Sequence, residues 1–394
     1  MRQRIFLLFS NLYVFTLLTD IRARFCFSPL GGIAGLAFTF CLLYGSVPVG
    51  ATDYLSLAKE GSYLIKNFKF KSGGELQELR INYATWGEPK KDEKGNVTNA
   101  VLLCHGTTGN WQNYANPWWA SKMYGPGQPL DINKYFIIAS DTIGSGKSSK
   151  PSDGLRMKFP KFIIEDVVKA QYILLTEGLG VNHLQAVIGI SFGGRQTWQW
   201  GVQYPDFMNG IVPIASSPFP NAGRRGMTDF LGIAPIIQDP TWKNGDYQQQ
   251  PHNFQLALMF YWMFLEGAGH LWEEAPTRKQ SFKYLPEVAK WWSKNLDAND
   301  WIYLMQVNDG FDAYSQLDEV KARVLIINMA GDEQVPVELQ HAEKAVEKLG
   351  DKAEYLLVKE FSNYGHFAAS KTIDIYGPKI GEFLKKLATP NKGG

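Results

Sequence analysis

The amino-acid sequence predicts an α/β fold: a mostly parallel sheet with helices on both faces and an inserted helical cap. The first observation is a series of short, nearly continuous apolar runs, as expected for strands buried on both faces of such a sheet. The second is that stretches with apolar residues at helical spacing lie between several of these runs. The runs are 100–104, 135–140, 186–190, 211–215, 324–328 and 355–358, and the helical stretches are 165–177, 193–204, 338–349 and 376–387.

The alternation of strands and helices stops between residues 218 and 316. We interpret 218–316 as a cap inserted over the carboxyl ends of the strands, so that the core consists of 52–217 and 317–394. A packed helical subdomain that binds no ligand is the alternative interpretation. The stretch is apolar and rich in aromatic residues, which are Trp242, Phe254, Phe260, Tyr261, Trp262, Phe264, Trp272, Trp291, Trp292 and Trp301.

Length and charge limit the class of protein. A chain of 394 residues with 45% hydrophobic and 20% charged residues suits one large domain with an insertion. Its formal net charge of +2 is too small to indicate nucleic acid or an anionic membrane surface as a partner. We therefore expect a small-molecule substrate, and a homodimer is compatible with the sequence. The sequence contains no metal-ligand cluster or nucleotide-binding fingerprint, so we expect no metal and no cofactor.

Residues 1–51 differ from the rest of the chain. Two arginines precede an apolar run at 5–18, a second apolar stretch covers 25–44, and small residues precede Thr52. This pattern favours an export signal cleaved before Thr52, which predicts a periplasmic or extracellular protein. An uncleaved membrane anchor and an upstream extension of a cytosolic protein are the alternatives. Cleavage leaves Cys104 as the single cysteine, and we expect that residue to be inert packing.

The sequence Gly189-Ile190-Ser191-Phe192-Gly193 indicates a serine nucleophile. It follows a run of buried-strand character and precedes a helical stretch, which is the context of a nucleophile elbow. The small residues on either side let strand and helix approach each other. Such a turn exposes the Ser191 hydroxyl at a helix amino terminus, where developing negative charge is stabilised.

A serine hydroxyl needs a base to remove its proton, and His366 is the best candidate. In proteins built around such an elbow, the acid and then the histidine follow the serine along the chain. His366 lies in a loop just past the last predicted strand, at a carboxyl end. Of the other histidines that follow Ser191, His252 and His270 fall in the cap, and His341 is expected to be a solvated helix residue.

Asp332 is the best candidate for the acid that orients His366. It follows the predicted strand 324–328 and a glycine, and Val335-Pro336 closes the turn. Its role would be to fix the imidazole tautomer and to stabilise the imidazolium. Glu333 is the nearest competitor, and simple capping of a turn is the structural alternative.

The turn at 105–109 is expected to supply part of an oxyanion hole. It follows the strand 100–104 and contains Gly106 and Gly109, so that a backbone N–H can point at the substrate oxygen. Thr107 is the expected first donor and Phe192, the residue after the nucleophile, the second. His105 is expected to support this loop.

Together these residues resemble the α/β-hydrolase superfamily, and within it the homoserine O-acetyltransferase-like branch. The similarity covers most of 65–390. The triad motifs are specific to the superfamily, and the Asp239-Pro240-Thr241-Trp242 segment points to the branch. The other matching segments are a hairpin at 70–86, the turn at 104–109, Asp141-Thr142-Ile143-Gly144-Ser145-Gly146, Phe159-Pro160, Gly245-Asp246-Tyr247 and Tyr364-Gly365-His366.

The sequence departs from this branch where the substrate is selected. The resemblance implies an arginine in a cap helix for the carboxylate of homoserine, and an aspartate directly after the histidine for its amine. Here 253–277 contains no lysine or arginine, and Phe367 follows His366. Arg224 and Arg225 are the nearest basic residues, and we expect them on a solvated loop. The alternative is that they turn toward the substrate and replace the missing arginine. An apolar pocket would reject a zwitterion.

The sequence therefore predicts a serine hydrolase, an esterase that cleaves an ester or related acyl bond of a largely uncharged substrate through an acyl-enzyme. The alternative is an O-acyltransferase, in which an alcohol replaces water as the acceptor. A more remote alternative is a non-catalytic binding protein on a hydrolase scaffold, against which the complete triad argues.

Overall fold

The computed structural model describes residues 52–388. The expected export leader at 1–51 lies outside the described residues. Within the described part of the chain, no helix combines the length and the apolar character that crossing a membrane requires. The compact unit that begins at Tyr54 contains the sheet, the cap and the candidate site.

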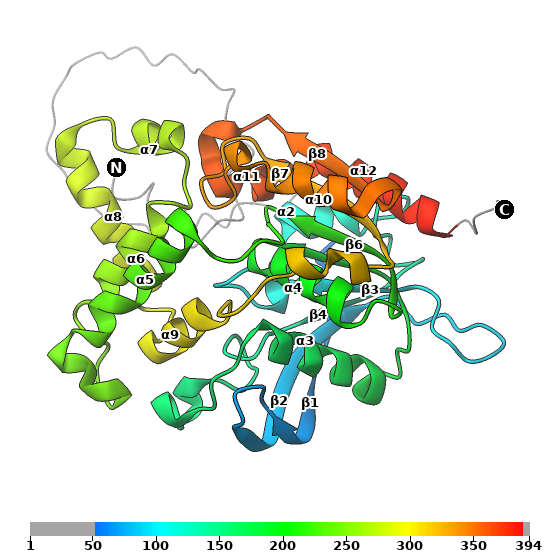
Figure 1. Ribbon diagram of the computed structural model, residues 1–394, viewed down its shortest axis with the longest axis horizontal. Coiled ribbons are helices and arrows are strands. Elements are labelled where there is room, and N and C mark those ends of the chain that lie inside the picture. Colours follow the sequence, from blue (N-terminus) through cyan, green and yellow to red (C-terminus); the bar gives the residue numbers. More distant parts are fainter. Residues whose placement is uncertain (1–51, 389–394) are drawn as a thin grey trace, which may run out of the picture. The chain divides into compact units, whose positions relative to one another are not determined.

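Within residues 52–388, eight strands form one sheet in the order β1-β2-β4-β3-β5-β6-β7-β8 (Figure 1). The hairpin of β1 and β2 is antiparallel, and β2 also pairs antiparallel with β4. All pairings from β4 to β8 are parallel, which confirms the predicted mostly parallel sheet. The strands are β1 (Lys59–Lys69), β2 (Glu75–Trp86), β3 (Ala100–Cys104), β4 (Phe136–Ser140), β5 (Leu184–Ile190), β6 (Met208–Ile214), β7 (Arg323–Met329) and β8 (Ala353–Val358).

Helices cover both faces of the sheet, as predicted. Alternate residues of a strand point to opposite faces, so in β3 Leu102 packs with one hydrophobic cluster and Leu103 with the other. Cys104 at the end of this strand is fully buried. The first cluster includes side chains of α3 (Ile164–Ile173), α4 (Phe192–Gln203) and α10 (His341–Leu349), and the second those of α2 (Pro117–Met123), α11 (Ala368–Lys371) and α12 (Ile373–Ala388).

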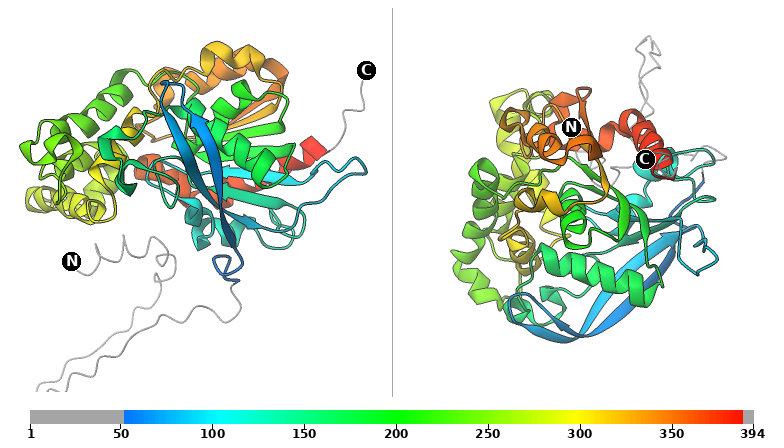
Figure 2. Two further views of the ribbon diagram at one scale, coloured as in Figure 1. Left: turned by 90° about the horizontal axis from the view of Figure 1, so that it is seen from below. Right: turned by 45° about the vertical axis from the view of Figure 1, so that its right-hand side comes forward.

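Five helices between β6 and β7 gather at one end of the sheet (Figure 2). They are α5 (Gly223–Ile237), α6 (Phe254–Trp262), α7 (Ala268–Glu274), α8 (Arg278–Trp292) and α9 (Ala298–Gln306). Aromatic side chains pack these helices together. The Trp301 ring, for example, stands edge-on to that of Tyr261 with 4.9 Å between the ring centres. Phe254, Tyr261, Trp262 and Trp301 are buried in the cap, whereas Trp272 is 72% exposed, so only part of the aromatic set forms the core of the cap.

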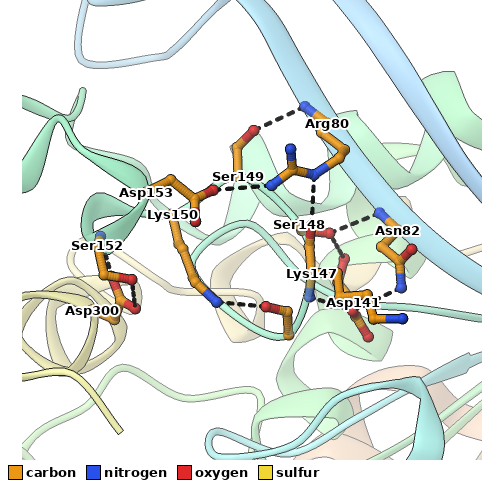
Figure 3. Close-up of polar contacts among 11 residues, drawn as sticks. Arg80, Asn82, Asp141, Lys147, Ser148, Ser149, Lys150, Ser152, Asp153 and Asp300 are labelled. Atoms are coloured by element: carbon orange, nitrogen blue, oxygen red, sulfur yellow. Dashed lines mark hydrogen bonds and ion pairs between the residues drawn. The ribbon is translucent and has the colours of Figure 1, made fainter.

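The loop at 141–153 ties the cap and the hairpin to the core (Figure 3). In α9, the Asp300 carboxylate accepts hydrogen bonds from the backbone N–H of Ser152 at 2.8 Å and from its hydroxyl at 2.6 Å. On the hairpin, Arg80 donates to the carbonyl oxygen of Lys147 at 2.7 Å and pairs with Asp153 at 3.1 Å. This loop follows β4 and borders the turn at 105–109, so these contacts fix the surroundings of the predicted oxyanion turn.

Helix boundaries differ from the prediction where backbone geometry intervenes. The stretch predicted at 338–349 becomes helical only at His341, because a short 3-10 turn at 337–339 ends on Gln340 in the left-handed region with φ 54°. The stretch predicted at 165–177 is α-helical to Ile173 and then continues as a π-helical turn to Gly178.

Candidate active site

Ser191 occupies a strained turn between β5 and α4. Its φ of 61° and ψ of −118° lie where non-glycine residues are rare. The two flanking glycines have no room for a side chain: a Cβ on Gly189 would lie 2.1 Å from the Gly193 carbonyl oxygen, and one on Gly193 would lie 1.8 Å from the Cys104 carbonyl oxygen. The observed geometry is the strand–turn–helix that the G-x-S-x-G sequence predicts.

The three residues predicted as a triad lie in one chain of hydrogen bonds. His366 Nε2 is 2.7 Å from Ser191 Oγ, and His366 Nδ1 is 2.7 Å from Asp332 Oδ2. Asp332 Oδ1 accepts from the backbone N–H groups of Gln334 at 2.8 Å and Val335 at 3.2 Å. Both His366 and Asp332 are buried. This arrangement allows His366 to take the Ser191 proton while Asp332 holds the imidazole in the required tautomer.

The turn between α6 and α7 holds the loop that carries His366. The backbone N–H of His366 donates to the carbonyl oxygen of Leu265 at 3.0 Å. Gly267 packs so closely on this loop that a Cβ there would lie 2.4 Å from the Asn363 carbonyl oxygen and 2.6 Å from the Gly365 nitrogen. The cap therefore sets the position of the predicted base.

We expect Gly267→Ala to lower kcat by about 10²-fold, because the added methyl group must push the His366 loop away from Ser191. Steady-state kinetics with an ester substrate measure this effect. Gly381→Ala is the matched control. Gly381 lies on α12, and a Cβ there meets Pro129 at 3.4 Å, near ordinary contact distance. Equal rates for the two variants would show that the cap does not position His366.

The residues that could have replaced Asp332 as the acid or His366 as the base do not contact Ser191. Glu333 pairs at 2.5 Å with Arg224 at the surface. His270 stacks on Tyr364 with 4.4 Å between ring centres and faces Glu266 within the cap. His341, expected to be a solvated helix residue, begins α10 and is only half-buried. Its ring stacks on Phe219 and its Nδ1 is 2.9 Å from Ser217 Oγ.

The predicted oxyanion residues, Thr107 and Phe192, lie on the same pocket wall as Ser191. Phe192 is the first residue of α4, and the N–H groups of a first helical turn have no partner within the helix. His105 supports the turn, as expected: its Nε2 accepts from the Thr142 N–H at 3.1 Å, so its Nδ1 donates to the Gly106 carbonyl oxygen at 2.8 Å. Burial lowers the pKa of His105, which keeps this ring neutral.

Two arginines that sequence reasoning did not place in the site line the pocket. Arg195 lies in α4, one helical turn after Ser191, and this spacing alone could have indicated that it shares a face with the nucleophile. Arg225 was expected on a solvated loop, and that expectation is wrong. It lies in α5, and its side chain is only 14% exposed. It contacts Asp229 at 3.0 Å and Gln334, because the cap folds it toward the turn that carries Asp332.

Comparisons with known proteins agree with this geometry. A family model described as alpha/beta hydrolase fold matches residues 99–369. The homoserine O-acetyltransferase of Haemophilus influenzae (strain 86-028NP) is 31% identical in an alignment of 350 positions that covers 79% of this chain and 94% of that protein. The homoserine O-acetyltransferase of Geotalea uraniireducens (strain Rf4) is 30% identical in an alignment of 368 positions that covers 82% of this chain and 95% of that protein.

Solved structures share the fold. Esterase E22 matches with a TM-score of 0.73 at 21% identity, over 83% of this chain and 100% of that one. The homoserine O-acetyltransferase from Bacillus anthracis matches with a TM-score of 0.71 at 26% identity, over 83% and 98%. Fold, site and comparisons define an enzyme that is an esterase or an acetyltransferase. The chain belongs to the α/β-hydrolase family, in its homoserine O-acetyltransferase-like branch.

Proposed function

We propose that this enzyme hydrolyses carboxylic esters through an acyl-enzyme on Ser191. The observation that carries the proposal is the continuous hydrogen-bond chain from Ser191 Oγ through His366 to Asp332 Oδ2. Ser191 Oγ attacks the ester carbonyl carbon as His366 Nε2 takes its proton. The backbone N–H groups of Thr107 and Phe192 stabilise the resulting oxyanion. The Asp332 carboxylate stabilises the imidazolium that forms on His366.

The acyl-enzyme then forms and breaks down with the same groups. When the tetrahedral intermediate collapses, the bond to the alcohol oxygen breaks and His366 Nε2 returns the proton to that oxygen. Water attacks the acyl carbon as His366 takes a proton from it, and the second collapse releases the carboxylic acid and restores the Ser191 hydroxyl. In this scheme the chain's own residues perform every proton transfer.

The second candidate function is transfer of the acyl group to an alcohol, as the names of the 30–31% identical relatives suggest. The chemistry differs only in whether water or an alcohol reaches the acyl-enzyme. Among the described residues that line the pocket, none carries a carboxylate, and Phe367 after His366 packs on Trp262 with 5.2 Å between ring centres. An amino-acid acceptor would therefore bring its ammonium group to a wall without a counter-charge, which favours hydrolysis.

The expected preference for a largely uncharged substrate needs revision. The expectation was based on a pocket without basic groups, whereas Arg195 and Arg225 both line the pocket. An ammonium group would still find no carboxylate among the described residues that line the pocket, so ester hydrolysis remains the favoured reaction.

We expect saturable hydrolysis of short acyl esters, and acetyl transfer from acetyl-CoA to homoserine no faster than background. The measurement is steady-state kinetics with 4-nitrophenyl esters, with and without alcohol acceptors, together with labelling by a fluorophosphonate. If the fluorophosphonate labels another residue and not Ser191, the assignment of Ser191 as the nucleophile is wrong. Saturable homoserine acetylation that exceeds ester hydrolysis would make the enzyme a transferase.

A further inference from the structure

Arg195 is a buried cation that forms no ion pair among residues 52–388. Only 7% of its surface is exposed, and it lines the pocket that contains Ser191. Its guanidinium donates to the Phe219 carbonyl oxygen at 3.3 Å and lies 5.0 Å from the centre of the Phe311 ring. No carboxylate within residues 52–388 forms an ion pair with it. Because removing a charge from water is costly, a buried guanidinium without a carboxylate is unusual for a purely structural residue.

Arg225 brings a second positive charge to the same wall. It shares its charge with Asp229, whose Oδ1 is 3.0 Å from Arg225 Nη2. Burial and the proximity of Arg225 together lower the pKa of Arg195 to about 9, so the two guanidinium groups repel each other. Asp229 pairs with Arg225, and Asp332, which also attracts Arg225, is hydrogen-bonded to His366. Among residues 52–388 neither carboxylate is in contact with Arg195.

Two further polar groups on this wall have no partner among the described residues. They are the hydroxyl of Ser216 and the side-chain Oδ1 of Asn308, and both atoms are buried. Buried polar groups are normally hydrogen-bonded. The part of the pocket lined by Arg195, Arg225, Ser216 and Asn308 is thus polar and positively charged, and its buried Ser216 and Asn308 oxygens have no partner. This is the expected state of a site that a ligand completes.

We propose that Arg195 and Arg225 bind a carboxylate of the substrate, and that the enzyme hydrolyses esters that bear a carboxylate but no ammonium group. The inference rests on the ester hydrolysis proposed above and adds the chemical class of the substrate. Guanidinium groups suit this role because their planar N–H groups match carboxylate geometry. The carboxylate can belong to the acyl part or to the alcohol part of the ester, and the experiment separates the two.

The experiment compares two pairs of esters that differ only in charge. For the acyl part, mono-4-nitrophenyl adipate is compared with its methyl ester. For the alcohol part, 4-acetoxybutanoate is compared with methyl 4-acetoxybutanoate, and released acetate is measured. We expect wild-type enzyme to prefer the carboxylate in one pair by at least about 10-fold in kcat/KM, and that pair identifies the part of the substrate that the arginines bind.

Arg195→Met should lower the ratio of kcat/KM between the charged and uncharged members of that pair by about 10-fold, which removes the preference for the carboxylate. Arg195→Lys, which keeps the charge but not the planar fork, should lower the ratio less. Arg224→Met is the matched control, since Arg224 lies at the surface with Glu333 and should leave the ratio unchanged. The comparison in the wild-type enzyme stands even where a variant folds poorly.

Binding to Ser191→Ala enzyme, measured by calorimetry, separates this inference from the proposed hydrolysis. Tighter binding of a charged ester than of its methyl ester, lost in Ser191→Ala/Arg195→Met, supports the carboxylate site even where wild-type enzyme cleaves neither ester. That pattern would refute only the hydrolysis. Equal binding and equal kcat/KM for both members of both pairs would overturn the carboxylate site, while hydrolysis would stand.

Discussion

Ser191→Ala is expected to lower kcat for ester hydrolysis by about 10³–10⁶ without disturbing the fold. The variant removes the nucleophilic oxygen, so no acyl-enzyme forms. Alanine is smaller than serine and fits the same turn, where the flanking glycines and not the Ser191 side chain determine the packing. Steady-state kinetics measure the loss of kcat, and a thermal melt shows whether the fold keeps its stability.

Ser281→Ala is the control for this loss. Ser281 lies in α8 and donates only to carbonyl oxygens of Ala275 and Thr277, so its removal should leave kcat close to that of wild type. If Ser191→Ala keeps most of the activity while it melts normally, another group is the nucleophile, and the assignment of the site is wrong.

Asp332→Asn is expected to lower kcat by about 10²–10⁴. Asp332 Oδ1 accepts two backbone N–H groups, from Gln334 and Val335, so the asparagine oxygen should stay there. Its Nδ2 then faces His366 Nδ1, donor against donor. The imidazole must move its proton to Nε2, and in that tautomer it cannot accept the proton of Ser191.

Glu333→Gln provides the comparison for Asp332→Asn. Glu333 is a surface residue paired with Arg224, and exposed pairs contribute little, so a change of less than about threefold is expected. The reverse order of effects in kcat would transfer the role of the acid to Glu333 and would leave the hydrogen bond between Asp332 and His366 without a catalytic purpose.

Much of the fold and the geometry of the site could be predicted because their signals are local. A run of apolar residues indicates a strand buried on both faces, and the elbow sequence itself shows the small residues Gly189 and Gly193 that such a turn requires. His366 and Asp332 follow predicted strands, and parallel strands bring their carboxyl ends to one edge of the sheet. The structure accordingly places both within 2.7 Å of their partners.

The placement of Arg225 could not be predicted from its neighbours. The residues before it look like a loop, and Gly223 does take a positive φ of 56° where α5 begins. What buries Arg225 is the approach of Gln334, which is distant in sequence, and of Tyr261, whose ring centre lies 5.4 Å from the guanidinium. The spacing of Arg225 and Asp229, one helical turn apart, was the one local sign that this segment is a helix.

The contact between Leu265 and the His366 backbone has a consequence for how the enzyme loses activity. The cap and the loop that carries His366 should move together, because the hydrogen bond to Leu265 and the close packing of Gly267 join them. Elements with few connections to a sheet open at lower free energy than the sheet itself. Heating that loosens the cap would therefore disconnect His366 from Ser191 while the eight strands are still paired, so inactivation should precede melting of the core.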